Sequence, residues 1–358
     1  MLGWLAIGVG LVVVVFALRG RLPSAGQIAD SLKVADTGWL VVALAAELFS
    51  MGMFARQQRR LLTAFGVTMP RHRALALAYS RSAISISVPG GSAVSAAYAF
   101  RQFRTDGVSR RAAATVMVLS GLLSMGALVL LYVTGILAAG VLRLAEAWRA
   151  HPALIESAVA MAVALLLLIA FLVWPAPKTF PDAPSGRTRP DRLAALATRA
   201  PRLAALATPV VDAVRSSRAV ATRDWALALA AATANWLTDL LCLAAAARAF
   251  HLPLSLVQLA AVYLTVQIVR QIPLTPGGIG IIEVSLLAGL ISAGAGEAPA
   301  AATVLAYRLL SCWLIIPIGM LGWLVLRRPY RPRTRQSDTD IVAVRQRKAG
   351  SLLSLGQL

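Results

Sequence analysis

Six charged side chains lie inside long apolar runs of this sequence, which makes them the first candidates for chemistry. The six are Glu47, Arg81, Asp239, Arg270, Glu283 and Arg308. A lone charge in the middle of a bilayer costs about 3 kcal/mol or more, so each side chain should face the protein interior and find a partner. Guanidinium groups bind phosphate oxygens through two parallel hydrogen bonds, so the arginines are candidates for an anion site.

Each of two Pro-Gly-Gly sequences follows one of these arginines. Arg81 lies eight residues before Pro89, and Arg270 lies six residues before Pro276. Such a turn frees the backbone amides at the start of the following helix, and these amides together with the helix dipole favour an anion such as phosphate. A helix break that serves packing alone is the alternative. The predicted substrate-binding residues are Arg81, Pro89, Gly90, Gly91, Ser92, Arg270, Pro276, Gly277, Gly278 and Gly280.

A second predicted group of residues would form a gate or an ion pair. Glu283 with Arg308 is the expected latch, and Glu283 or Asp239 would carry the proton if transport is coupled to one. Two purely structural ion pairs, Glu283 with Arg308 and Asp239 with Arg270, are the alternative, since a buried pair alone is weak evidence of function. The group consists of Asp239, Glu283, Tyr307 and Arg308.

Sequence patterns typical of catalysis or metal binding are absent. The chain has no P-loop, no HExxH, no CxxC pair and no GxSxG elbow. Its histidines, His72, His151 and His251, are far apart, and Cys242 and Cys312 both lie in apolar runs, which excludes a disulfide framework. We therefore expect no catalytic residue, no metal and no cofactor, and we predict that the chain is not an enzyme.

Composition places the chain among polytopic membrane proteins. Of its 358 residues, 58% are hydrophobic and 14% are charged, whereas about 25% of the residues of an ordinary soluble domain are charged. The net charge of +20 comes from 35 Lys and Arg against 15 Asp and Glu. These basic residues lie in short segments between apolar runs, as in cytoplasmic loops, rather than in a nucleic-acid-binding surface. We predict an all-α integral membrane protein with no nucleic acid partner.

Helices that cross the hydrocarbon core need about 20 mostly apolar residues. Two apolar regions, 74–100 and 255–293, are interrupted by Pro-Gly-Gly, and their short arms reach only part of the way across. The other apolar runs predict six full spans. They are residues 2–18, 38–54, 112–139, 156–174, 225–248 and 301–326.

Arginine-rich connections assign the two sides of the membrane, because cytoplasmic loops carry an excess of Lys and Arg. Region 74–100 leaves from and returns to such segments, whereas region 255–293 leaves from and returns to the outer side. We therefore predict two opposed re-entrant hairpins, with two full crossings in each region as the alternative, and both termini in the cytoplasm. The expected cytoplasmic segments are 55–73, 101–111, 175–223 and 327–358.

An internal duplication relates the two halves of the membrane region. The sequence Ala-Ala-Ala-Thr-Val follows the first Pro-Gly-Gly after 20 residues, at 112–116, and follows the second after 21, at 300–304. Hairpins from opposite faces make this an inverted repeat, the plan of many secondary transporters, and a turn at membrane depth must line a wet cavity. The predicted division is membrane half one 1–174, basic loop 175–224, membrane half two 225–326 and basic tail 327–358.

The second half resembles the lysylphosphatidylglycerol synthase transmembrane-region family, also called flippase-like. The resemblance rests on Pro273 to Glu283, which reads PLTPGGIGIIE, followed by Tyr307-Arg308. Val88-Pro89-Gly90-Gly91 with Tyr98 is similar to the turn of that family's first repeat, so the resemblance covers most of residues 1–328. Where the family commonly has a Gly-Glu pair after this turn, the chain has Ser92-Ala93-Val94-Ser95.

The resemblance implies a membrane region that moves lipid between leaflets. Known members join this region to a soluble transferase that makes lysyl-lipid, and we expect only the translocating part here, because no transferase follows Leu358. We predict a bacterial inner-membrane protein that translocates an anionic phospholipid or lipid-linked intermediate. The alternative is a non-transporting membrane partner that presents lipid to a separate enzyme of envelope lipid biosynthesis. The oligomeric state stays open.

Overall fold

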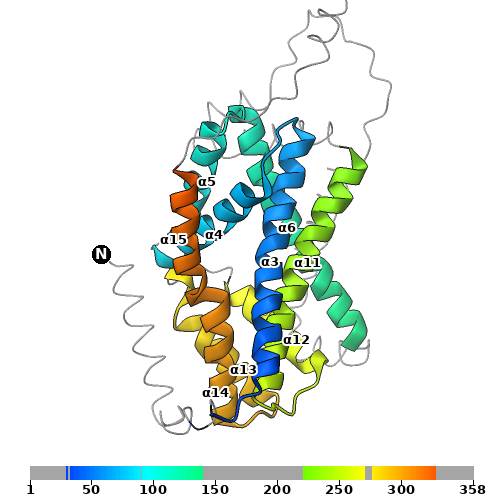
Figure 1. The fold of residues 1–358 in the computed structure, drawn as a ribbon. Helices are drawn as coiled ribbons and strands as arrows, with labels where there is room; N and C mark the ends of the chain where they lie inside the picture. The colour runs from blue at the N-terminus through cyan, green and yellow to red at the C-terminus, as the bar shows by residue number, and fades with distance from the viewer. Residues whose placement is uncertain (1–29, 31–32, 89, 140–220, 271–275, 328–358) are drawn as a thin grey trace, which may run out of the picture.

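The computed structural model describes residues 30, 33–88, 90–139, 221–270 and 276–327 (Figure 1). Within these residues every regular element is a helix, which confirms the predicted all-α class. Two of the six predicted spans, 2–18 and 156–174, lie outside the described residues. The basic loop up to residue 220 and the tail from residue 328 lie outside them as well.

Four helical stretches in the described part are long and apolar enough to cross a membrane. They correspond to four of the predicted spans. A helix of 28 residues is about 42 Å long, more than the roughly 30 Å of the hydrocarbon core. The stretches are α3 (Thr37–Ala64), α6 (Arg110–Ala139), α11 (Thr222–Ala249) and the run formed by α14 (Glu297–Arg308), η2 (Leu309–Trp313) and α15 (Ile315–Leu326).

Helix α3 extends beyond the predicted span. The apolar run ends at residue 54, but the helix continues to Ala64, so the first part of the predicted loop 55–73 is helical. Polar contacts hold this last part: Gln57 Nε2 donates to Ser120 O at 3.0 Å and Arg59 Nε to Met69 O at 2.9 Å. The helix can continue past the predicted span because apolarity marks only the part of a helix that lies in lipid; the predicted cytoplasmic location of 55–73 stays a prediction.

Helices α3 and α11 form an antiparallel pair (Figure 1). At one end Asp36 N donates to Ala249 O at 2.9 Å, and near the middle Ser50 Oγ donates to Asn235 O at 3.0 Å. Small buried residues such as Ala43 and Ala246 lie in the core around this pair, where small side chains allow helix backbones to approach closely. The pair is the frame that the other elements surround.

Each interrupted apolar region folds into a helical hairpin. Hairpin 1 consists of α4 (Arg71–Ser87) and α5 (Gly91–Thr105), and hairpin 2 of α12 (Leu256–Arg270), η1 (Pro276–Gly278) and α13 (Ile281–Ser292). With 12 to 17 residues, these helices are about 18 to 25 Å long. Each of these helices is therefore shorter than α3 and α11, which have 28 residues each.

The base of each hairpin is tied by a side chain. In hairpin 1 the Arg73 guanidinium donates to Asp106 Oδ1 at 2.7 Å, with both side chains buried. Burial raises the pKa of the Asp106 carboxyl, and Arg73 offsets part of this shift. In hairpin 2, Gln258 Nε2 donates to Ala293 O at 3.2 Å. In each hairpin the second helix therefore ends close to the point where the first helix begins.

The two hairpins start from opposite ends of the α3–α11 pair and meet at their tips (Figure 1). Hairpin 1 follows the C-terminal end of α3, and hairpin 2 follows the C-terminal end of α11, which lies at the other end of the antiparallel pair. A Cβ atom on Gly277 would lie 3.0 Å from Ile86 O, so the second turn packs directly on the end of α4. The two chain breaks are thus neighbours inside the bundle.

The two halves share one element order: a long helix, a hairpin and a second long helix. Four of the corresponding helix ends also share a left-handed residue that closes a Schellman motif. Three of these residues are glycines and the fourth is a histidine, the one non-glycine with positive φ in the described part of the chain. They are Gly66, Gly107, His251 and Gly294, with φ of 75°, 83°, 55° and 107°.

Helix α15 belongs to the second half but packs on hairpin 1. Its Gly319 and Gly322 lie against α4, where a Cβ on Gly319 would be 2.6 Å from Tyr79 O. Ser80 Oγ donates to Gly319 O at 3.0 Å across this contact. A larger residue at 319 would push α15 away from α4, so the second half braces the first hairpin.

Candidate functional site

The first turn, between α4 and α5, is open at its tip. Gly90 has a left-handed conformation (φ 66°) and begins α5, and both Gly90 and Ser92 are exposed. Gly91 is buried, and a Cβ there would be 2.8 Å from Ile84 O, so only glycine allows this close approach. The amides of Ala93 and Val94 donate to Gly90 O, whereas helix geometry leaves those of Gly91 and Ser92 without a partner in their own helix. Pro89 lies outside the described residues.

Arg81 of α4 has an aromatic neighbour and no acidic one. Its guanidinium lies 5.2 Å from the centre of the Phe54 ring of α3, a cation–π contact. Among the described residues Arg81 makes no ion pair. A cation–π contact leaves the N–H donors of the guanidinium available to a ligand.

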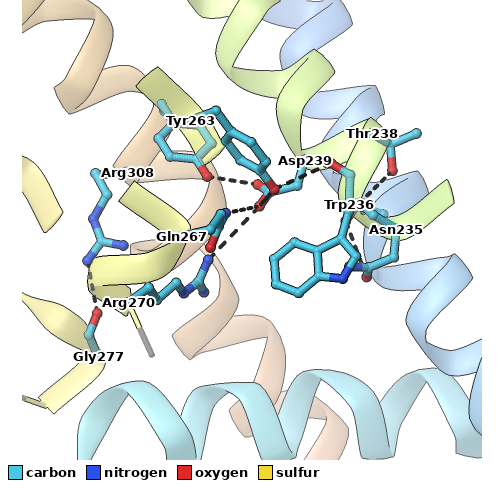
Figure 2. Close-up of polar contacts among 11 residues, drawn as sticks. Asn235, Trp236, Thr238, Asp239, Tyr263, Gln267, Arg270, Gly277 and Arg308 are labelled. Carbon is cyan, nitrogen blue, oxygen red and sulfur yellow. Dashed lines mark hydrogen bonds and ion pairs between the residues drawn. The ribbon is translucent and has the colours of Figure 1, made fainter. Parts of the chain in front are cut away.

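The second turn, Pro276–Gly280, is held from two sides. Arg308 Nε contacts Glu283 Oε1 at 2.6 Å, and Arg308 also donates to Gly277 O at 3.3 Å (Figure 2). The other oxygen of Glu283 accepts from Gly280 N at 2.7 Å, which caps α13. We call these contacts of Glu283, Arg308, Gly277 and Gly280 the latch. The Arg308 side chain is only 5% exposed, so no ligand reaches it while the latch is closed.

Asp239 of α11 is the centre of a second polar cluster. Its Oδ2 accepts from Tyr263 OH at 2.8 Å and from Gln267 Nε2 at 3.5 Å, and Arg270 NH1 lies 4.0 Å away. Its Oδ1 accepts from Tyr307 OH at 2.9 Å. Figure 2 shows the three side chains of α12 converging on this carboxylate. Asp239 therefore ties α11 to α12 and α14.

The structure gives the two predicted anion-binding arginines different neighbours. Arg270 is paired with Asp239, with 40% of its side chain exposed, whereas Arg81 stacks on Phe54. Both ion pairs that the sequence allowed, Glu283 with Arg308 and Asp239 with Arg270, are present. The predicted gate residues accordingly form two clusters, and Tyr307 belongs to the one around Asp239.

Neither Tyr263 nor Gln267 is among the site residues predicted from the sequence. Both contact Asp239. A signal for them exists, because Tyr263, Gln267 and Arg270 follow one another at spacings of four and three residues, which places them on one face of a helix. The Phe54 partner of Arg81 had no such signal, since it lies on a different helix.

Glu47 of α3 was noted as a buried charge but not assigned to the site. It is 6% exposed, and its Oε2 has no hydrogen-bond partner in the described part of the chain. Carboxylate oxygens in this situation are rare, because burial without a partner is costly.

A cavity of about 640 Å³ lies at the end of α11, away from both turns. It is lined by Trp39, Arg248, His251, Leu252 and Pro253. Among the described residues no three His, Cys, Asp or Glu side chains come close enough to hold a metal ion.

Comparison with protein families gives one match. A family described as the lysylphosphatidylglycerol synthase TM region matches residues 3–319. The matched range includes both hairpins, both turns, the latch and the cluster around Asp239. No curated protein sequence matches the chain.

Proposed function

We propose a lipid-translocating function on one premise: the chain belongs to the lysylphosphatidylglycerol synthase transmembrane-region family. It is a multi-pass membrane protein of a family associated with lipid handling. The substrate we propose is an anionic phospholipid or a lipid-linked intermediate. Its head group would pass between the hairpins while its acyl chains stay in the bilayer. We further propose that the protein itself performs no chemical step on the lipid.

The observation that carries this proposal is the meeting of two glycine turns that come from opposite ends of the bundle. Gly277 lies against Ile86, the residue four positions before Gly90. Non-helical backbone at membrane depth is tolerated only inside protein or beside a water-filled space. Re-entrant hairpins that meet near the midplane would provide such a space for a head group, and the short hairpin helices are consistent with this arrangement.

Arg81 and the first turn would receive the phosphate in succession. Side chains of a helix lean towards its N-terminus, so the Arg81 guanidinium lies on the base side of the turn. A phosphate entering along α4 would meet Arg81 first and then the amides at the start of α5, near Gly91 and Ser92. The exposed tip of this turn and the absence of an acid beside Arg81 in the described residues support this order.

The second turn would act as the gate. While Glu283 holds Arg308 and Gly280, the turn is fixed and Arg308 is closed to ligand. When the latch opens, a phosphate that takes the place of Glu283 on Arg308 would keep Glu283 from closing it again and let hairpin 2 move. Guanidinium binds phosphate and carboxylate with the same geometry, so this exchange needs no new site.

Proteoliposomes containing the full chain test the function. A fluorescent anionic phospholipid in the inner leaflet should become accessible to a membrane-impermeant quencher faster than in protein-free vesicles, whereas a zwitterionic analogue should not. Absence of any acceleration, with the protein folded and a copurifying lipid-modifying enzyme, would instead favour the role of a non-transporting partner. The proposed location is the bacterial inner membrane with both termini in the cytoplasm.

Arg81→Ala is the sharpest variant for this assay. We expect it to slow translocation by at least about ten-fold, the effect of losing roughly 1.4 kcal/mol of phosphate binding. Arg327→Ala is the matched control, because Arg327 also stacks on an aromatic ring, that of Trp323, but is exposed at the end of α15. Equal rates for the two variants would remove Arg81 from the path.

A further inference from the structure

Two buried carboxylates, Glu47 of α3 and Asp239 of α11, lie at the same level of the α3–α11 pair. Glu47 and Asp239 are 6% and 7% exposed. Glu47 lies ten residues after the start of α3 at Thr37, and Asp239 lies ten residues before the end of α11 at Ala249. Because those two helix ends are joined through Asp36, the carboxylates lie in the same layer, about 15 Å from that end.

The two acids have unequal surroundings. Asp239 accepts three hydrogen bonds and has Arg270 beside it, whereas Oε2 of Glu47 has no hydrogen-bond partner among the described residues. The ionisable groups that interact electrostatically with Glu47 come from four helices and include a single cation. They are Tyr79 of α4, Asp239 and Cys242 of α11, Arg270 of α12 and Tyr307 of α14.

Counting charges shows that this layer lacks one positive charge. Among the described residues, two ionised carboxylates against the Arg270 guanidinium leave one net negative charge, and both carboxylates are buried. An uncompensated buried charge costs several kcal/mol, and protonation of one carboxylate removes that cost. Asp239 has the ion pair and the hydroxyl donors that stabilise an ionised form, whereas Glu47 forms no ion pair and its Oε2 accepts no hydrogen bond in the described part of the chain.

We propose that Glu47 is a proton-binding site, and that it takes up and releases one proton from water while Asp239 stays ionised beside Arg270. The occupant is a proton and not a sodium ion. Sodium needs several oxygen ligands at once, and the Asp239 oxygens already accept hydrogen bonds from Tyr263 and Tyr307. A proton needs only the one free carboxylate oxygen that Glu47 offers.

This site would supply the coupling ion for the proposed lipid transport, and that part rests on the proposed function. Arg81 is a cation without an acidic partner, and Glu47 is an acid without a basic one, in the described part of the same bundle. One anionic phosphate at Arg81 and one proton at Glu47 would neutralise both. Movement of the two together across the membrane would carry no net charge.

Infrared spectroscopy of the full chain in lipid nanodiscs tests the proton site without any transport. The wild type at neutral pH should show the carbonyl stretching band of a protonated, buried carboxyl that shifts in D₂O. Glu47→Gln should remove the band, and Glu297→Gln, which changes an exposed acid at the start of α14, should leave it. Asp239→Asn should also remove it, because Glu47 would then ionise to pair with Arg270.

The possible outcomes separate the proton site at Glu47 from the proposed lipid transport. Absence of the band from the wild type overturns the proton site and needs no variant to be folded, and persistence of the band in Glu47→Gln overturns the assignment. In proteoliposomes a proton gradient, and not a sodium gradient, should accelerate lipid movement, and Glu47→Gln should lose at least ten-fold of that acceleration. A sodium gradient that replaces the proton gradient would overturn the choice of ion. A band without any lipid movement would leave the proton site standing and remove the transport function.

Discussion

The two glycine turns have corresponding places in the element order and opposite surroundings. Measured from their prolines, α6 and α14 both begin 21 residues on, and the two Ala-Ala-Ala-Thr-Val sequences agree to within one residue. Seven residues after the proline the second half has Glu283 and the first has Ala96, and 32 residues after it they have Arg308 and Gly121. The latch therefore has no counterpart in the first half.

This difference matches the two roles proposed above, a turn that receives the head group and a turn that gates. The turn of hairpin 1 is exposed at its tip and has Arg81 nearby without an acid, whereas the turn of hairpin 2 is fixed by three polar contacts. A turn that receives a ligand needs free donors, and a turn that gates needs a contact that can open. The first half has the exposed turn, and the second half has the turn that is held by the latch.

Removing the latch should have the largest effect on stability. Arg308→Ala leaves Glu283 without its cation and Gly277 O without its donor, and loss of one partner of a buried pair costs about 3 kcal/mol. Thermal unfolding in detergent measures this loss. Arg81→Ala should cost less than about 1 kcal/mol, because among the described residues Arg81 forms a cation–π contact and no ion pair. Equal losses would contradict the asymmetry of the two turns.

Alanine in place of the turn glycines should show the same asymmetry on a smaller scale. Gly90 and Gly277 have nearly the same φ, 66° and 60°, but only Gly277 has a neighbour in the way, Ile86 O at 3.0 Å. We expect Gly90→Ala to cost about 1 kcal/mol of left-handed strain, and Gly277→Ala about 2 kcal/mol or more. Thermal or denaturant unfolding compares the pair, and a larger loss at Gly90 would argue against the contact between the tips.

Building a latch into the first half tests the comparison directly. Ala96→Glu with Gly121→Arg places the missing pair at the positions that correspond when counted from the prolines, and a Cβ on Gly121 meets nothing within 4 Å. The double variant should slow lipid movement about ten-fold, as expected if roughly 1.4 kcal/mol holds the first turn. Each single variant serves as the control. A double variant as fast as the wild type would show that the first turn need not move.

The smallest expected effect concerns the ends of α3 and α11. His251 occupies a left-handed position that Gly66 occupies in the first half, so His251→Gly should stabilise the protein by about 1 kcal/mol. Gly66→Ala should destabilise it by a similar amount, although there is open space around Gly66. Thermal unfolding gives both values. Destabilisation by His251→Gly would mean that the imidazole makes contacts worth more than the strain.

Sequence patterns located the hairpins because their signals are local. Pro-Gly-Gly and the arginines before it are read from a few neighbouring residues, and the spans are read from continuous apolar runs. The division between an open and a latched turn was not predictable, because both arginines precede a Pro-Gly-Gly at similar spacing. Arg270 differs from Arg81 through Asp239, which another helix supplies. The sequence also could not predict that Glu47 and Asp239 lie at the same level, because this depends on how α3 packs on α11.

Boundaries and helix irregularities were also beyond the sequence. The polar last turns of α3 are helical because Gln57 and Arg59 find partners on other elements. The π-helical turn η2, Leu309–Trp313, directly follows Arg308. Nothing in the composition of its residues sets them apart from the rest of the run from α14 to α15. Such features come from tertiary contacts that form only in the assembled bundle.

The contact between Ser80 and Gly319 has a consequence for biosynthesis. The two residues are 239 positions apart in the chain, yet α15 is the element that supports α4. During translation hairpin 1 leaves the ribosome long before its support exists, so it must either wait at the insertion machinery or enter the bilayer in a provisional arrangement. Maturation of the amino-terminal half thus depends on synthesis of the carboxyl-terminal one.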